Sequence, residues 1–292
     1  MSLVSKFVNR SFKKSDEKRD AGLTTPDDIL RFDDIVYGPD QKWQKLDVYR
    51  PKDMEGKLPV IVSVHGGGWV YGDKELYQYY CMSLAQLGFA VINYTYRLAP
   101  EFKYPSSMED TDLVFVWGEE HAEEFGLDWN NLFAVGDSAG AHMLALYACM
   151  CCDPAFSEEN GLLIRGRCPD AVALNCGVYR VEKCKGPDLT SALMKDLLPG
   201  KGTEEELHRI SPIYHLPKDF PAAFVMTAAG DFLASQAAPM TEALKALGVE
   251  AEYHYYGDKE HMLGHVFHVN MRLKEAHDCY MDEAEFFRRH TK

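Results

Sequence analysis

The sequence has no apolar run long enough for a membrane span, and its first twenty residues lack the apolar core of a signal peptide. It also has no internal repeat and no low-complexity tract. Basic residues are outnumbered, because 31 Lys and Arg stand against 45 Asp and Glu, which gives a net charge of −14. This balance argues against nucleic acid as a partner and against stable membrane association. We therefore expect a cytoplasmic protein.

Cysteine patterns typical of disulfide frameworks or zinc sites are also missing. Three of the eight cysteines crowd one predicted helix, namely Cys149, Cys151 and Cys152. The other five are scattered without C-x-x-C pairs, namely Cys81, Cys168, Cys176, Cys184 and Cys279. In a chain of this length, the pattern indicates reduced and mostly buried thiols. We expect no metal and no organic cofactor.

What the sequence does contain is enough apolar residues for one large core, 46% of 292. Short apolar, β-prone runs alternate with helix-length segments. The expected strands are 34–38, 44–50, 60–64, 90–94, 132–135, 171–175, 222–228 and 252–256. This alternation predicts an α/β fold with a mostly parallel sheet, helices on both faces and an antiparallel beginning. We expect residues 1–292 to form a single domain, with its ligand beyond the carboxyl ends of the strands.

Two segments are expected to form a small helical cap. Residues 1–30 begin with an amphipathic helix, and Thr25–Asp28 carries the signal of a second helix start. Residues 177–221 form a long insertion with short helical pieces between two strands. Such insertions tend to be lids or binding loops, although a solvated crossover is the alternative. The basic first helix is expected to dock on its own protein rather than on a membrane surface.

The strand at 132–135 leads into the sequence Gly-Asp-Ser-Ala-Gly at 136–140, and a helix-favouring segment follows at once. A strand that turns into a helix through G-x-S-x-G is the context of a nucleophile elbow. In this turn the hydroxyl of Ser138 would point out at the end of the strand. The N-terminus of the following helix would offer unpaired N–H groups to an oxyanion. The alternative is a chance match in a glycine-rich turn.

A serine nucleophile needs a base, and the base needs an orienting acid. The chain order expected for this elbow is Ser, then Asp, then His. Asp231 follows the strand at 222–228, so its carboxylate would lie at the same sheet edge, unless it serves as a helix N-cap. The candidate bases after the last strand are His261, His265, His268 and His277.

Three ordered motifs resemble one known family: HGGGW at 65–69, YRLAPE at 96–101 and GDSAG at 136–140. They are similar to those of the hormone-sensitive-lipase-like branch of the α/β-hydrolases, which includes many microbial carboxylesterases. The resemblance implies that oxyanion-hole N–H groups come from Gly67, Gly68 and Ala139. Trp69 and Tyr71 would wall the substrate pocket, and His65 would be structural.

The resemblance and the spacing disagree about the catalytic histidine. In the family this histidine is followed by any residue and then Phe, a pattern that His265 fits and His261 does not. Counted from Asp231, however, His261 lies at the spacing usual in the family. We select His265 and expect a slightly enlarged loop before it.

The resemblance therefore implies a serine carboxylesterase that acts on small-molecule esters through an acyl-serine. Bulky aromatics and a limited cap favour short acyl chains, such as acetyl and butyryl. A non-catalytic ligand receptor on the same fold, or a lipase or amidase of the same superfamily, is the alternative. Members of the family often pair, which implies a homodimer.

Overall fold

The computed structural model describes residues 3–183 and 189–292, so Cys184 lies outside the described residues. The strands are β1 (Ile29–Val36), β2 (Lys45–Pro51), β3 (Leu58–Val64), β4 (Ala90–Thr95), β5 (Leu127–Asp137), β6 (Ala171–Asn175), β7 (Ala222–Ala228) and β8 (Ala251–Tyr256). The α-helices are α1 (Leu3–Asp20), α2 (Gln78–Gln86), α3 (Ser106–Glu120), α4 (Ala122–Phe125), α5 (Ala139–Cys152), α6 (Pro154–Glu159), α7 (Leu189–Leu197), α8 (Glu204–Arg209), α9 (Ala237–Ala246) and α10 (Lys274–Arg289).

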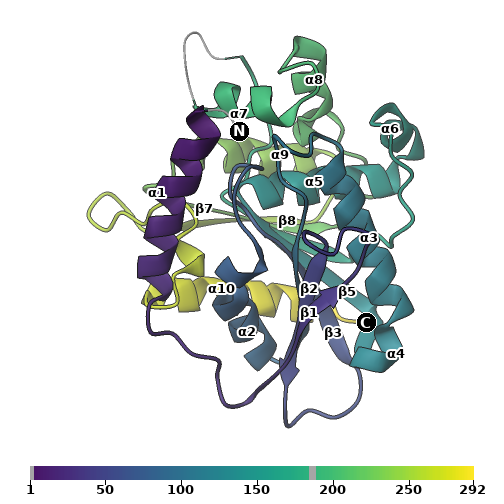
Figure 1. Cartoon of the computed structure of the whole chain (residues 1–292), viewed down its shortest axis with the longest axis vertical. Coiled ribbons are helices and arrows are strands. Elements are labelled where there is room, and N and C mark those ends of the chain that lie inside the picture. Colours follow the sequence, from purple (N-terminus) through teal and green to yellow (C-terminus); the bar gives the residue numbers. More distant parts are fainter. Residues whose placement is uncertain (1–2, 184–188) are drawn as a thin grey trace.

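Within these described residues, one eight-stranded sheet forms the centre of the molecule, in the order β1-β2-β4-β3-β5-β6-β7-β8 (Figure 1). β2 pairs antiparallel with β1 and with β4, whereas every pair from β4–β3 to β7–β8 is parallel. The expected α/β fold, with a mostly parallel sheet and an antiparallel beginning, is confirmed.

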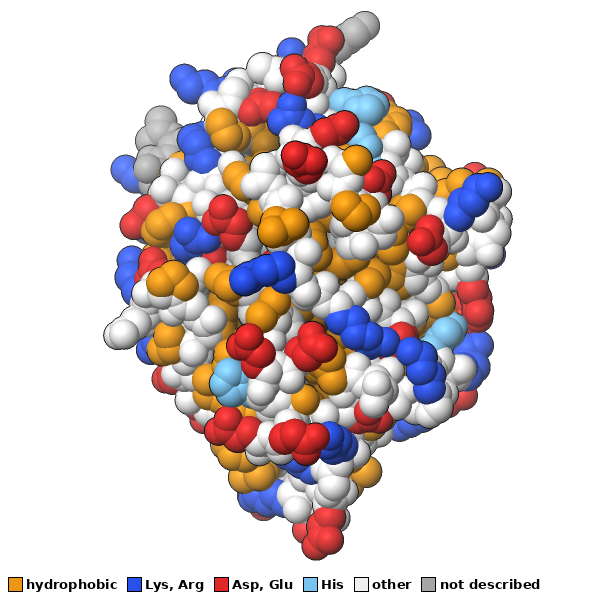
Figure 2. All heavy atoms as spheres, turned by 90° about the vertical axis from the view of Figure 1, so that its right-hand side faces the viewer, with side chains coloured by type: hydrophobic (Ala, Val, Ile, Leu, Met, Phe, Trp, Pro, Cys, Tyr) orange, Lys and Arg blue, Asp and Glu red, His pale blue; other side chains and the backbone are white. Residues whose placement is uncertain are grey.

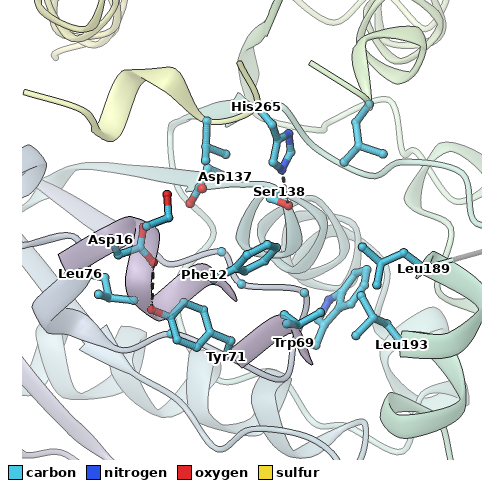
Figure 3. A pocket seen from close by; sticks show the side chains of 18 of the residues that line it. Phe12, Asp16, Trp69, Tyr71, Leu76, Asp137, Ser138, Leu189, Leu193 and His265 are labelled. Atoms are coloured by element: carbon cyan, nitrogen blue, oxygen red, sulfur yellow. Dashed lines mark hydrogen bonds between the residues drawn. The ribbon is translucent and has the colours of Figure 1, made fainter. Parts of the chain in front are cut away.

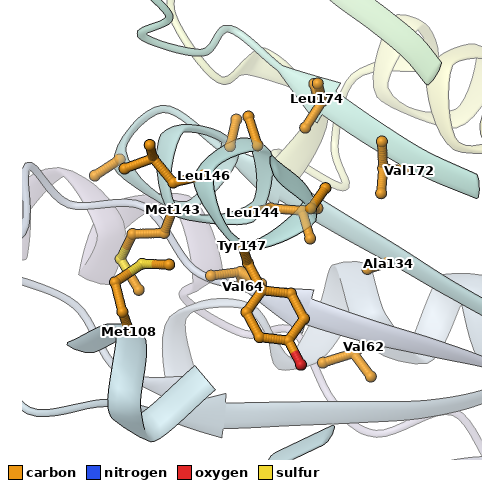
Figure 4. Close-up of a cluster of buried hydrophobic side chains, with 14 of the residues drawn as sticks. Val62, Val64, Met108, Ala134, Met143, Leu144, Leu146, Tyr147, Val172 and Leu174 are labelled. Carbon is orange, nitrogen blue, oxygen red and sulfur yellow. The ribbon is translucent and has the colours of Figure 1, made fainter. Parts of the chain in front are cut away.

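The central strands are apolar on both faces because helices cover both faces. On β3, Val62 and Val64 belong to the cluster that contains side chains of α3 and α5 (Figure 4). Ile61, the residue before Val62 on the same strand, packs instead into the cluster built with α2 and α10. Alternate residues therefore enter opposite layers, as the two-residue period of a strand requires.

One expected helix start is wrong. Thr25–Asp28 does not begin a helix; it leads into β1, which starts at Ile29 and pairs with β2 from Pro51 onward. An N-cap signal is local, whereas the hydrogen bonds between β1 and β2 come from residues about twenty positions away, and the pairing prevails. β5 is also longer than the expected 132–135.

The expected first helix is α1, and it lies beside α7 from the insertion between β6 and β7. Figure 1 shows the two helices adjacent at one end of the molecule. The hydroxyl of Ser5 on α1 hydrogen-bonds the carboxylate of Asp196 on α7. The chain thus brings residues from its beginning and its middle together at the carboxyl ends of the parallel strands.

The surface mixes charges of both signs. Figure 2 shows Lys and Arg interspersed with Asp and Glu on the face that carries α3, α4 and α6. On this face the basic side chains do not form a continuous stripe of the kind that tracks a nucleic-acid backbone. None of the helices in residues 3–183 and 189–292 is both long and apolar enough to cross a membrane.

Candidate active site

Ser138 sits in a tight turn between β5 and α5. Its backbone adopts φ 51° and ψ −115°, a conformation that non-glycine residues rarely adopt. The turn closes only with glycine nearby, since a Cβ on Gly140 would lie 2.0 Å from the carbonyl oxygen of Val64. The N–H of Ser138 donates to the carbonyl of Asn175 at 2.8 Å, which ties the turn to the end of β6. The structure therefore contains the strand–turn–helix that the motif predicts.

Three side chains from distant parts of the chain meet at this turn. The Nε2 atom of His265 lies 2.9 Å from the hydroxyl oxygen of Ser138 (Figure 3). On the other side of the ring, Nδ1 lies 2.6 Å from Oδ1 of Asp231. Because a carboxylate only accepts, Nδ1 carries the proton, and Nε2 is left to accept the proton of the serine hydroxyl.

Asp231 is held as an anion by its neighbours. Burial by itself raises the pKa of Asp231, but the hydrogen bond from His265 and those from the Leu233 N–H and the Thr227 hydroxyl bring the pKa below its ordinary value. The last two donors lie at 2.9 and 2.7 Å. An ionised Asp231 fixes the imidazole orientation and stabilises the imidazolium that forms when the ring takes a proton.

His261 is not part of this arrangement. Its exposed ring points to Glu275, with Nε2 2.8 Å from a carboxylate oxygen. Of the remaining candidates, His268 is buried in a 3-10 turn (Phe267–Val269) and His277 lies on α10. The structure thus brings His265 to Ser138, in agreement with the family pattern rather than with the count from Asp231.

The loop at HGGGW faces the same cavity as Ser138. Gly67 and Gly68 have φ values of 113° and 60° and both line the cavity. Within the described part of the chain, their N–H groups donate no hydrogen bond to the protein. Ala139 is the first residue of α5, so its N–H has no acceptor within the helix. These three N–H groups are the donors that the resemblance implies for an oxyanion.

His65 supports this loop from below, as expected. Its ring stacks on Tyr96 with centroids 4.0 Å apart, and Nδ1–H donates to the carbonyl of Gly66 at 2.7 Å. Burial lowers the pKa of His65 to about 4, so the ring stays neutral at physiological pH. It has no contact with Ser138 that would suit a base.

We expect Gly67→Ala to disable the loop. A Cβ at this position would lie 2.1 Å from the carbonyl oxygen of Tyr71, and the positive φ disfavours any side chain. Displacing one oxyanion donor should lower kcat by about 10²–10³-fold on a short aryl ester. Gly161→Ala is the matched control, because Gly161 also has a positive φ but no atom within 4 Å of its Cβ position. Equal activity of the two variants contradicts a role for this loop.

Two buried acids stand behind the catalytic turn. Burial raises the pKa of Asp137 to about 6, and its carboxylate accepts from the hydroxyl of Tyr77 at 2.8 Å. That hydroxyl in turn accepts from the N–H of Gly66 at 3.0 Å, which links the serine motif to the glycine loop. Burial likewise raises the pKa of Glu283 to about 7; this side chain accepts from the amide of Asn175 at 2.6 Å.

The cavity above Ser138 has a volume of about 280 Å³ and draws its walls from several parts of the chain. They include α1, residues 66–72, α7, residues 232–233 and residues 265–266. Trp69 and Tyr71 line the cavity, as the resemblance implies. Trp69 is fixed by a hydrogen bond from its indole N–H to Nδ1 of His142 at 3.2 Å.

The cavity residues on α1 were not predicted individually from the sequence. Val8, Phe12 and Asp16 all line the cavity, at intervals of four residues along one helix face. This spacing is visible in the sequence and marks a face that packs against the protein. The spacing does not show whether this helix face packs on the hydrophobic core or lines a ligand cavity.

Only one described group of His, Cys, Asp and Glu side chains is close enough to hold a metal ion. It consists of Cys176, Asp231 and His265, whose ligand atoms lie within 4.8 Å of one another. A metal ion there would displace the hydrogen bond between His265 and Asp231. The group therefore does not fit a resident metal beside the serine arrangement.

A family model for the α/β-hydrolase fold matches residues 61–265, from β3 through His265. The chain belongs to this family. Its motifs place it in the hormone-sensitive-lipase-like branch of the α/β-hydrolases. The carboxylesterase NlhH of Mycobacterium tuberculosis is 30% identical over 244 residues, which cover 79% of this chain and 75% of that protein.

Other relatives match over a smaller part of their length. The esterase LipC of Mycobacterium tuberculosis is 36% identical over 127 residues, 43% of this chain. The chain covers only 31% of LipC and 48% of another relative from that organism, the probable carboxylic ester hydrolase LipM. Among solved structures of α/β-hydrolases, esterase B of Lactobacillus rhamnosis with a tributyrin phosphonate inhibitor superposes with a TM-score of 0.88. It has 24% identity and covers 98% of this chain and 95% of that one.

Proposed function

We propose that this α/β-hydrolase is a serine carboxylesterase, with Ser138 as nucleophile, His265 as base and Asp231 as orienting acid. One observation carries the proposal: the continuous hydrogen-bonded chain from Asp231 through His265 to the hydroxyl of Ser138. The hydroxyl opens into a cavity whose wall includes the glycine loop. The names of the relatives support hydrolysis of carboxylic esters.

The geometry supports a two-step acyl transfer. Oγ of Ser138 bonds to the ester carbonyl carbon while Nε2 of His265 takes the hydroxyl proton. The carbonyl oxygen becomes an oxyanion, for which the N–H groups of Gly67, Gly68 and Ala139 are the proposed donors. When the C–O bond to the alcohol breaks, His265 gives its proton to the departing oxygen. Water then attacks the acyl-serine and gives a proton to His265, which returns it to Oγ as the acid leaves.

We further propose that α1 and the insertion with α7 form a small cap and restrict the acyl chain. The cavity volume of about 280 Å³ is near the lower end of the range of about 300–1,000 Å³ for ligand pockets. Trp69, Leu189 and Leu193 give one side of it bulky apolar walls (Figure 3).

The cysteines in the described ranges are free thiols, which supports the proposed cytoplasmic location.

A series of aryl esters tests both the activity and the chain-length preference. Hydrolysis rates are measured for aryl esters from acetate to dodecanoate. An aryl phosphonate titrates the concentration of active sites, by which each rate is divided, and mass spectrometry locates the label on Ser138. We expect stoichiometric labelling of Ser138 and the highest kcat/KM at acetyl to butyryl. An optimum beyond about ten carbons contradicts the short-chain proposal. Labelling without any turnover points to a receptor instead.

A further inference from the structure

The catalytic cavity has one apolar side and one polar side. Figure 3 shows Trp69 and the two leucines of α7 on one side of Ser138, and Asp16 and Tyr71, with Leu76 beside them, on the other. Phe12 of α1 lies between the two sides. An ester bound at Ser138 therefore extends toward two chemically different surfaces. The short-chain preference proposed above concerns the apolar side and leaves the polar side unexplained.

Asp16 retains capacity to accept hydrogen bonds in the cavity. Its Oδ2 accepts from the hydroxyl of Tyr71 at 2.9 Å, and its Oδ1 accepts from Nη1 of Arg19 at 3.0 Å. A carboxylate has about four acceptor positions, so two stay open. The side chain is 19% exposed, and the residue belongs to the cavity wall. A ligand in the cavity can therefore reach this carboxylate.

Arg19 does not cancel the negative charge of Asp16. Its guanidinium makes two hydrogen bonds to Asp20, at 2.7 and 2.6 Å, and one to the carbonyl of Leu76 at 2.8 Å. One cation is thus shared between two carboxylates, and the three side chains carry a net charge of −1. Burial raises the pKa of Asp16, because its anion has lost part of its hydration. A positive group brought by a ligand would restore some of that stabilisation.

We infer that the polar side of the cavity binds an ammonium group carried by the ester, and that Asp16 sets this specificity. The inference rests on the proposed esterase function and names its substrate class: short esters with a cationic substituent on the acyl or the alcohol part. Arg19 also lines the cavity, but its guanidinium is hydrogen-bonded to Asp16, to Asp20 and to the carbonyl of Leu76. An anionic substituent would therefore meet the open oxygens of Asp16 and be rejected. A neutral alkyl substituent of the same shape would leave the two open acceptor positions of Asp16 unfilled.

Two matched pairs of esters test the inference. On the alcohol side, 2-(dimethylamino)ethyl butyrate is compared with 3-methylbutyl butyrate, in which a CH replaces the protonated nitrogen. On the acyl side, ethyl 4-(dimethylamino)butyrate is compared with ethyl 5-methylhexanoate. At pH 7 both amines are protonated. The quantity measured is the ratio of kcat/KM for the cationic ester to that for its neutral partner.

We expect the wild-type ratio to exceed one in at least one pair, and Asp16→Asn to lower that ratio by about fivefold, the effect of one partly exposed ion pair. Glu17→Gln is the control, because it removes the same charge from the next position on α1, where the side chain is exposed and outside the cavity. Its ratio should match the wild-type ratio.

A wild-type ratio below one in both pairs overturns the inference, even if Asp16→Asn fails to fold. An unchanged ratio in folded Asp16→Asn also overturns it, and so does an equal fall in Glu17→Gln. Wild-type hydrolysis of the neutral esters alone shows that the esterase proposal stands without this specificity. If neither ester of either pair is hydrolysed, the proposed function itself has failed.

Discussion

We expect Ser138→Ala to lower kcat/KM for an aryl acetate by at least about 10⁴-fold, because the substitution removes the nucleophilic oxygen. The remaining groups, His265 and the glycine loop, cannot form an acyl-enzyme. The fold should survive, because alanine tolerates the backbone angles of Ser138 as well as serine does, and the side-chain hydrogen bond that is lost is the one to Nε2 of His265. Initial rates and a thermal unfolding curve check both statements.

Ser157→Ala is the matched control for this variant. Ser157 is also a helix-associated serine with one hydrogen bond, to the carbonyl of Leu162 at 2.9 Å, but it lies on α6 away from the cavity. Its kcat/KM should stay close to the wild-type value. If Ser138→Ala keeps more than a few per cent of the wild-type rate, another group is the nucleophile and the proposed mechanism is wrong.

The second large effect separates the two histidines. His265→Ala should lower kcat/KM by about 10⁴-fold or more, because no other imidazole among the described residues hydrogen-bonds the serine hydroxyl. His261→Ala should stay within about twofold of wild type, since the ring it removes is exposed and contacts only the surface carboxylate of Glu275. Steady-state rates on one short aryl ester, with both variants at equal concentration, give the comparison.

The opposite pattern is equally informative. Collapse in His261→Ala with an active His265→Ala would mean that the working enzyme uses a different loop conformation from the one described. Collapse in both variants would point to a structural role for the loop that carries them, and circular dichroism would then show a loss of fold in His261→Ala.

The sequence predicted the sheet well because its central strands are mostly apolar. Runs such as Val60–Val64 and Ala222–Ala228 are buried on both faces, so their composition alone marks them. The edge strand β1 was harder to predict. The burial of its residues is uneven, so its composition does not mark it as a strand. It is a strand because it pairs with β2, and the local helix signal at Thr25–Asp28 carries no information about that pairing.

The catalytic site, like the sheet, has parts that the sequence predicts and parts that it does not. The turn at Ser138 follows from a local motif, but the choice of histidine depends on how a loop closes. Gly230 and Gly264 form a bridge, with the N–H of Gly230 donating to the carbonyl of Leu263 at 2.8 Å. Residues 258–262, just before that bridge, are exposed, and His261 is among them. Counting residues from Asp231 along the chain cannot show which histidine the closed loop places at Ser138.

The cavity face of α1 was not predictable residue by residue for a related reason. A helix presents its apolar stripe to whatever it packs on, and that partner here is α7, more than 160 positions later in the chain. The packing of α7 decides whether the apolar stripe of α1 is buried in the core or lines a cavity, and the sequence of α1 does not contain that information.

The order of the catalytic residues along the chain has a consequence for synthesis. The serine turn at 136–140 leaves the ribosome well before the acid at 231 and the base at 265. A nascent chain thus displays an inert alcohol for most of its elongation, without an imidazole to activate it. Reactivity toward esters requires that His265 has also left the ribosome and folded against Ser138.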